Sequence, residues 1–182
     1  MFAQALLWLV ICDVITIVVM LQRDHKIVGP SDFLFQSLSD CDGVDSVVRF
    51  GITQKKYNRS TNVLEISFGA PYDLGDDIVV ELKGSLKKDG GYKPGAYYMK
   101  DTLCNLLKSI VGDIANDILS QAGSEGCPIP AGDYIAEQYY FDNKKFNVPQ
   151  VFGDYRMEVF VYKDEVLQSC YLAYYELKQK CD

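Results

Sequence analysis

The chain has 182 residues, of which 48% are hydrophobic and 24% charged, and it contains 13 Tyr and 9 Phe. This composition excludes an intrinsically disordered chain, and the length fits one globular domain with a core of its own. The formal net charge is -7, and basic residues occur in no run longer than a pair. Nucleic acid is therefore excluded as a partner, because a phosphate backbone would find no basic surface to bind.

The N-terminal segment is strongly apolar. Residues 3–21 are interrupted only by Gln4, Asp13 and Thr16, and the first basic side chain is Arg23. The pattern predicts a secretory signal peptide over residues 1–22 and a single domain over residues 23–182. Two alternatives stay open: a retained membrane anchor, because about 19 apolar residues just span a bilayer, and a buried core helix.

Cysteine usage also favours the secretory route. The five cysteines after the leader are Cys41, Cys104, Cys127, Cys170 and Cys181. They form no C-x-x-C pair, so disulfides explain them better than a zinc site or a thioredoxin-type motif. The triplet that begins at Asn58 is an N-glycosylation acceptor in a polar stretch. The odd number leaves one thiol free or paired with another chain, and Cys181 is our candidate.

Six segments alternate apolar and polar residues with a period of two, as half-buried strands do. In chain order they are residues 44–52, 62–68, 77–87, 133–142, 154–162 and 166–178. Residues that favour turns separate them at 69–71, 89–91, 93–95 and 147–149. We therefore expect a mainly β protein, an antiparallel sandwich or cup of six or seven strands.

One segment has helical periodicity instead. Apolar residues from Thr102 to Leu119 fall on one helix face, with Asp101 or Thr102 available as N-cap, and predict one continuous helix. Cys104 lies in its first turn and Cys127 follows it. Fifteen helical steps rise about 22 Å, and the eight extended steps back to Cys127 reach about 26 Å. A bridge between these cysteines is feasible and would clamp the helix and its return strand into a flap.

The order of these features resembles a known family. The matching motifs are CDGVDSVV at Cys41, DTLCNLL at Cys104, CPIPAGDY at Cys127, VPQVFGDYRMEVFVY and SCYLAYYELK. They resemble the ganglioside GM2 activator protein of the ML-type lipid-recognition superfamily and its arthropod branch, which includes the secreted chemosensory proteins of the CheB type. The likeness runs from about residue 40 to the end and is most specific between Cys127 and Tyr162.

The resemblance implies a lipid-recognition β-cup with an apolar cavity that lifts a lipid from a membrane or carries it through water. It implies that Cys41 pairs with Cys170 and that Cys104 pairs with Cys127. The chain-entropy model gives roughly 5 kcal/mol for the long loop and roughly 3 kcal/mol for the short one. Activator-type proteins carry additional bridges in the flap region, and Cys181 has no counterpart among them.

Several side chains are candidates for lipid contact. They come from the helix stripe and from the apolar loop 146–152, and they are Leu106, Ile110, Ile114, Phe146, Val148 and Phe152. Ordinary core packing is the alternative for the helix stripe. Large rings also occupy both faces of several segments, at Tyr97-Tyr98, Tyr139-Tyr140-Phe141, Tyr171 and Tyr174-Tyr175. Basic residues flank the loop and could meet an anionic head group or simply be solvated: Lys144, Lys145 and Arg156.

Catalysis is not expected. The chain has no G-x-S-x-G, H-E-x-x-H, P-loop or dinucleotide motif, and the single His, His25, lies near the start. A Ser or Cys nucleophile therefore lacks a base, and no metal or cofactor is implied. Asp113 and Asp117 lie four residues apart on the helix and fit a solvated face. An enzyme would require two carboxyls inside a cleft.

These observations predict a secreted, non-catalytic lipid-binding or lipid-transfer protein that buries an acyl-chain lipid, with the lysosomal lumen as the other compartment. Expected partners are the lipid or a small apolar ligand, a membrane surface, and a hydrolase or a receptor. The alternative is an extracellular chemosensory or signalling module that binds a small apolar cue or a receptor.

Overall fold

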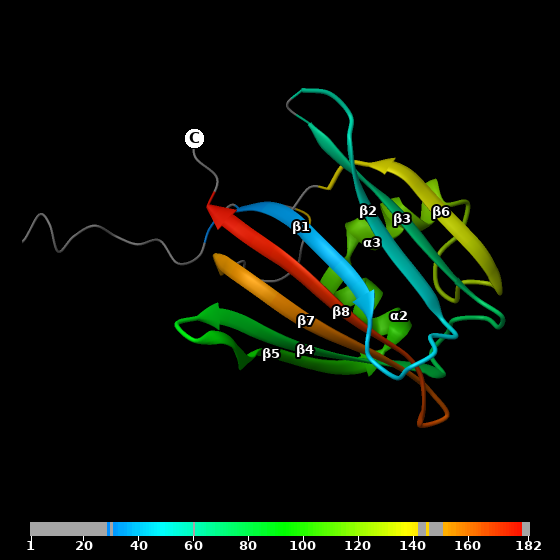
Figure 1. Ribbon diagram of the computed structural model, residues 1–182. Coiled ribbons are helices and arrows are strands. Elements are labelled where there is room, and N and C mark those ends of the chain that lie inside the picture. The colour runs from blue at the N-terminus through cyan, green and yellow to red at the C-terminus, as the bar shows by residue number, and fades with distance from the viewer. Residues whose placement is uncertain (1–28, 30, 60, 142–144, 146–150, 180–182) are drawn as a thin grey trace, which may run out of the picture.

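The computed structural model describes residues 29, 31–59, 61–141, 145 and 151–179. Within these residues the chain forms two antiparallel sheets and one helical segment (Figure 1). The strands are β1 (Ser31–Asp40), β2 (Arg49–Lys56), β3 (Asn62–Ala70), β4 (Ile78–Lys88), β5 (Gly91–Thr102), β6 (Gly132–Tyr139), β7 (Gly153–Lys163) and β8 (Val166–Gln179). The helical segment contains α2 (Leu103–Leu106), the π-helix η1 (Leu107–Val111) and α3 (Asp113–Gln121).

The two sheets form the predicted antiparallel β-sandwich, which is thereby confirmed. The larger sheet has the strand order β1-β8-β7-β4-β5 and the smaller has the order β2-β3-β6. Figure 1 shows the sheets diverging from the end that carries the β7–β8 hairpin. We call this the disulfide end, because both disulfides lie near it, and we call the opposite end, where β1 begins and β8 ends, the far end.

Two strands escaped the sequence analysis. In β1 a register shift lies between Phe35 and Ser37, and the apolar residues fall at Phe33, Leu34, Phe35 and Leu38, so the period-two pattern is lost. In β5 the run Lys93-Pro94-Gly95 was expected to form a turn, and it lies instead inside the strand. It is tolerated there because β5 is an edge strand and because a bulge leaves Gly95 and Ala96 without partners on β4.

A junction between β2 and β8 joins the two sheets at the disulfide end. Cys41 is bonded to Cys170, with the two Cα atoms 5.3 Å apart. Ser169 Oγ accepts a hydrogen bond from the Val48 amide at 2.8 Å. The Tyr171 hydroxyl accepts from the Phe50 amide at 3.0 Å and donates to the Val48 carbonyl. These contacts, which we call the β2–β8 junction, fix the start of the smaller sheet against the larger one.

The helical segment connects the sheets on their other side. Its first helix, α2, packs against β4 and β5, whereas α3 packs against β6. The expected continuous helix from Thr102 to Leu119 is therefore wrong. The Gly112 amide donates to the Leu107 carbonyl, five residues back, and Gly112 then takes a φ of 55° that glycine tolerates best. The break redirects the chain from one sheet to the other.

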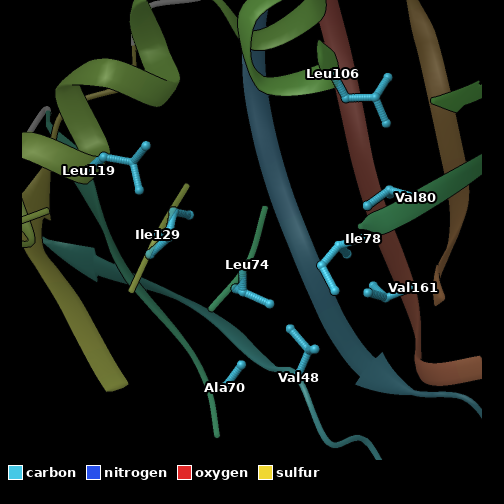
Figure 2. Packing of buried hydrophobic residues seen from close by; sticks show 9 residues of the cluster. All are labelled: Val48, Ala70, Leu74, Ile78, Val80, Leu106, Leu119, Ile129 and Val161. Atoms are coloured by element: carbon cyan, nitrogen blue, oxygen red, sulfur yellow. The ribbon is translucent and has the colours of Figure 1, made fainter. Parts of the chain in front are cut away.

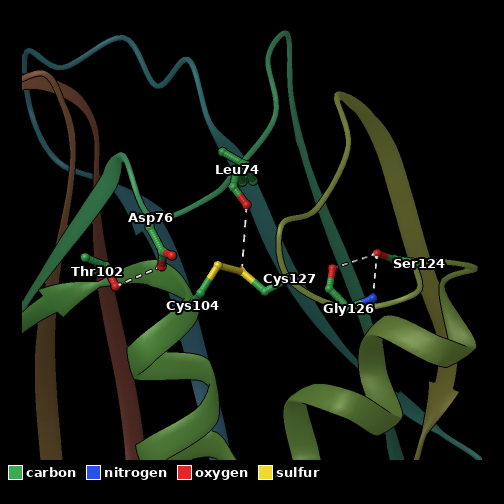
Figure 3. The surroundings of a disulfide bond; sticks show 7 residues. All are labelled: Leu74, Asp76, Thr102, Cys104, Ser124, Gly126 and Cys127. Atoms are coloured by element: carbon green, nitrogen blue, oxygen red, sulfur yellow. Dashed lines mark hydrogen bonds between the residues drawn. A yellow bond between two sulfur atoms is a disulfide. The ribbon is translucent and has the colours of Figure 1, made fainter.

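A second disulfide, between Cys104 and Cys127, ties the start of this segment to the chain before β6, with Cα atoms 5.6 Å apart (Figure 3). The Cys127 sulfur lies 3.8 Å from the Leu74 carbonyl oxygen. Leu74 and Ile129 exchange two backbone hydrogen bonds of 2.8 and 2.9 Å. Both disulfides are those that the resemblance implied, and the helical segment is clamped as expected.

The buried core divides into two clusters. One lies at the disulfide end and consists of Val48, Ala70, Leu74, Ile78, Val80, Leu106, Leu119, Ile129 and Val161 (Figure 2). The other lies against the smaller sheet and consists of Leu64, Ile66, Ile114, Ala136 and Tyr139. Partly buried Phe68 packs against both clusters. The helical segment contributes side chains to both clusters, and the apolar stripe of one straight helix could not reach both.

Several expectations fall on residues outside the described part of the chain, namely the signal peptide over residues 1–22, Phe146, Val148 and Cys181. They stay predictions. A search of the described residues finds no helix that combines the length and the apolar character needed to cross a membrane.

The β2–β8 junction can be tested with Tyr171→Phe. The change keeps the ring but leaves the Val48 carbonyl and the Phe50 amide without their phenol partner, so we expect the free energy of unfolding to fall by about 1–3 kcal/mol. Tyr174→Phe is the control, since Tyr174 is on the same strand with its ring against Tyr92 on the outer face. Urea denaturation measures both, and equal losses would contradict a special role for Tyr171.

Candidate functional site

Apolar side chains on the inner side of the sandwich remain only half-buried. Leu82 pairs with Val159 on β7 and with Met99 on β5, so these three lie side by side on the larger sheet. Leu107 and Ile110 of η1 pack, like these three, against the core cluster at the disulfide end. No residue of η1 is fully buried. We call these five residues the inner apolar surface. Covering it with an apolar ligand would be favourable, because it would remove hydrocarbon from water.

Towards the far end, three tyrosines cover the inner face of the larger sheet. The Tyr155 and Tyr175 rings are stacked, with centroids 5.2 Å apart and an interplanar angle of 11°. Tyr97 extends from the edge strand β5 so that its ring centroid lies 6.3 Å from that of Tyr155. The three rings thus span four neighbouring strands, β8, β7, β4 and β5.

Tyr97 can cross β4 because residue 84 is glycine. A Cβ atom on Gly84 would lie 2.2 Å from a ring carbon of Tyr97, which is far inside van der Waals contact. The ring therefore lies directly on the Gly84 backbone. This close approach is what brings the hydroxyl of a β5 residue within reach of β8.

The ring series continues to the smaller sheet. Phe33 on β1 has its ring centroid 5.3 Å from that of Tyr175 and 4.5 Å from that of Phe141, which follows β6. Phe141 in turn contacts Tyr139 edge-on at 6.4 Å. Aromatic contacts therefore link the two sheets at the far end, as the β2–β8 junction links them at the disulfide end.

The phenol groups in this series are the polar atoms of an otherwise apolar surface. The Tyr97 and Tyr175 hydroxyl oxygens are 3.0 Å apart and share a hydrogen bond, whereas the Tyr155 hydroxyl donates to the Val151 carbonyl at 2.9 Å. Burial raises the pKa of Tyr97 to about 12 and raises the pKa of Tyr175 and of Tyr155 as well. All three phenols are therefore neutral at physiological pH.

The residues proposed for lipid contact are placed differently from one another. Ile114 is 1% exposed and Leu106 is 7% exposed, so both side chains are part of the packed core. Ile110 is half-buried on the inner apolar surface. Phe152 is half-buried just before β7, near Gly29, while Phe146 and Val148 lie outside the described residues. Ile110 is therefore the half-buried member of the three helix candidates, and contact with a lipid stays a prediction.

The basic residues near the expected loop have other partners. Lys145 forms an ion pair with Asp117 of α3. Arg156 lies over the Tyr92 ring at 5.9 Å, on the outer face of the larger sheet. Lys144 lies outside the described residues. Asp113 and Asp117 are both exposed, which agrees with a solvated helix face.

A polar surface cavity of about 380 Å³ lies beside the β2–β8 junction and was not predicted. Its lining consists of Asp40, Val44, Asp45, Ser46, Arg49, Phe50 and Tyr171. Both carboxyls, Asp40 and Asp45, are exposed, so the cavity does not provide the burial that a general acid requires. In the described part of the chain, no group of three or more His, Cys, Asp or Glu side chains is arranged to hold a metal ion.

The sequence shows the tyrosine pairs but not which member of each pair faces inward. Strand pairing settles this, because Tyr97 lies opposite Gly84 and Tyr175 lies opposite Tyr155 on the inner face, while Tyr98 and Tyr174 face outward. A period-two count from the apolar residues of β8 would have selected Tyr175. For Tyr97 the bulge in β5 removes that signal.

No protein-family model matches the chain, and no curated protein matches its sequence. Among solved structures it is similar to the crystal structure of a Niemann-Pick type C2 protein from Japanese carpenter ant, with 13% sequence identity, 80% of this chain and 92% of that chain covered, and a TM-score of 0.26. The resemblance to the lipid-recognition superfamily stays a prediction.

The raised pKa values of Tyr97, Tyr155 and Tyr175 predict that the folded protein loses stability at alkaline pH. An unfolded phenol ionises near pH 10, whereas folded Tyr97 keeps its proton to a pKa of about 12. The unfolded state therefore loses protons first, and the free energy of unfolding should fall as pH rises from about 10 to about 12. Denaturation at stepped pH measures this. Tyr97→Phe should flatten the dependence, and an unchanged slope would contradict the assignment.

Proposed function

We propose that this protein binds a lipid or a similar apolar ligand between its two sheets and that it acts without catalysis. The observation that carries the proposal is the inner apolar surface, whose side chains face inward from both the larger sheet and the helical segment and yet stay half-buried. Removing one CH₂ group from water gains about 0.8 kcal/mol. Burial of a sixteen-carbon chain therefore gains about 12 kcal/mol, before the entropy lost in ordering the ligand and the protein is subtracted.

The helical segment supports this proposal by the way it is held. Its start is fixed by the Cys104–Cys127 disulfide, and α3 is fixed by buried Ile114 and Leu119 and by a hydrogen bond from Gln121 to the Glu137 carbonyl. The π-helix between these two anchors has no fully buried residue. We infer that η1 is the part of the flap that covers the ligand, because its packing against protein is incomplete.

The competing proposal, a chemosensory module for a small apolar cue, uses the same inner surface. Ligand length separates the two, since a carrier of acyl-chain lipid gains affinity with each added CH₂ up to long chains. A cue binder would reach its best affinity with a short or branched ligand. A partner hydrolase, a receptor and a membrane surface as the lipid source stay predictions.

Ligand binding can be tested on the protein purified without detergent. We expect mass spectrometry of an organic extract to show co-purified lipid and a fluorescent acyl probe to bind. Ile110→Asp should weaken probe binding at least about tenfold, because a carboxylate would then face the ligand chain. Ser109→Asp on the exposed side of η1 is the control. Absence of lipid together with absence of probe uptake would contradict the proposal.

We also propose a secreted or lysosomal location, which the two disulfides support because such bonds persist in oxidising compartments. Asn58 is exposed in the connection between β2 and β3, where its side-chain oxygen accepts a hydrogen bond from the Thr61 amide at 2.9 Å. A glycan on this residue would project into solvent.

Expression in a eukaryotic secretory host tests this location. We expect one N-glycan, which the enzyme peptide-N-glycosidase removes with a measurable loss of mass. Asn58→Gln and, independently, Ser60→Ala should each abolish that mass difference, because each destroys the acceptor triplet. A secreted chain of unmodified mass would show that Asn58 is not used.

A further inference from the structure

We propose that the hydroxyl pair of Tyr97 and Tyr175 binds the uncharged polar atom of a lipid, a hydroxyl or carbonyl oxygen, and so selects neutral lipids over fatty-acid anions. The inference rests on the proposed function and names the ligand class for the same interior. The two hydroxyl oxygens lie 3.0 Å apart although their strands are separated by β7 and β4.

Within the described residues, the pair has hydrogen-bonding capacity left over. Two phenols carry two O–H donors, and their mutual hydrogen bond uses one of them. The third tyrosine on the inner face of the larger sheet, Tyr155, donates its hydrogen bond to the Val151 carbonyl instead. The Tyr97–Tyr175 pair can therefore donate one hydrogen bond and accept others, which matches a ligand alcohol or carbonyl oxygen.

Among the described residues, the rings that contact the pair are aromatic and uncharged. The Phe33 ring lies against Tyr175, and the Tyr155 ring lies against both members of the pair. Three described cations near the pair are placed away from it: Arg156 lies on the outer face over Tyr92, Lys87 pairs with Asp154 at 3.8 Å, and Lys93 is exposed on the edge strand β5. A carboxylate next to the pair would be desolvated without a cation beside it, which is costly.

The phenols are also suited to stay neutral donors. Burial raises the pKa of each, so neither ionises in the physiological range. Gly84 holds the arrangement in place, because any larger residue would displace the Tyr97 ring. Gly84 is in this sense a positioning residue for the pair.

The experiment measures displacement of a fluorescent acyl probe by hexadecane, 1-hexadecanol and palmitate at pH 8. Wild-type protein should bind hexadecanol at least as tightly as hexadecane, because the pair replaces the hydrogen bonds that the alcohol loses in leaving water. Palmitate should bind about tenfold or more weakly than the alcohol. This comparison needs no variant, so it is independent of any effect of mutation on folding.

Phenylalanine variants complete the test. Tyr97→Phe and Tyr175→Phe should each weaken hexadecanol binding about five- to tenfold without changing the affinity for hexadecane, since the rings remain. Tyr174→Phe is the matched control, because it removes a phenol from the outer face of the same strand.

The outcomes separate the two proposals. Binding of hexadecanol with no dependence on Tyr97 or Tyr175, or palmitate binding as tight as that of the alcohol, overturns the hydroxyl-pair inference and leaves the proposed function standing. Failure of wild-type protein to bind any of the three probes overturns both.

Discussion

The β2–β8 junction is the constraint on which the arrangement of the two sheets depends. It combines the Cys41–Cys170 disulfide with hydrogen bonds that the Val48 and Phe50 amides donate to the hydroxyls of Ser169 and Tyr171. All of these contacts lie at one end of the sandwich. Because the smaller sheet is held there by its first strand, it can diverge from the larger sheet towards the far end, where aromatic rings rather than backbone bonds connect the two.

The helical segment follows from that divergence. A straight helix presents one apolar stripe, whereas this segment must supply Leu106 and Leu119 to one core cluster and Ile114 to the other. The π-helix and the left-handed φ of Gly112 supply the required change of direction. The cost is an incompletely packed middle portion, which leaves Leu107 and Ile110 half-buried. Short π-helical turns of this kind occur frequently at functional sites.

Much of the fold could be predicted from the sequence because hydrophobic alternation is a local signal. Six strands and a helical stretch were found that way, and the family resemblance implied both disulfides. What failed depends on tertiary context: the bulges that hide β1 and β5, and the break at Gly112. The candidate site was predicted in part, since Ile110 was named but Tyr97 and Tyr175 could be placed only once strand pairing fixed their faces.

The bulge in β5 has a consequence for how molecules of this protein meet one another in solution. An unprotected outer strand can recruit a strand from a neighbouring molecule and so begin aggregation. On β5, Pro94 offers no amide hydrogen, Gly95 and Ala96 interrupt the regular spacing, and Lys93 and Lys100 are exposed along the strand. The same irregularity that disguised the strand in the sequence therefore protects that border of the larger sheet against intermolecular pairing.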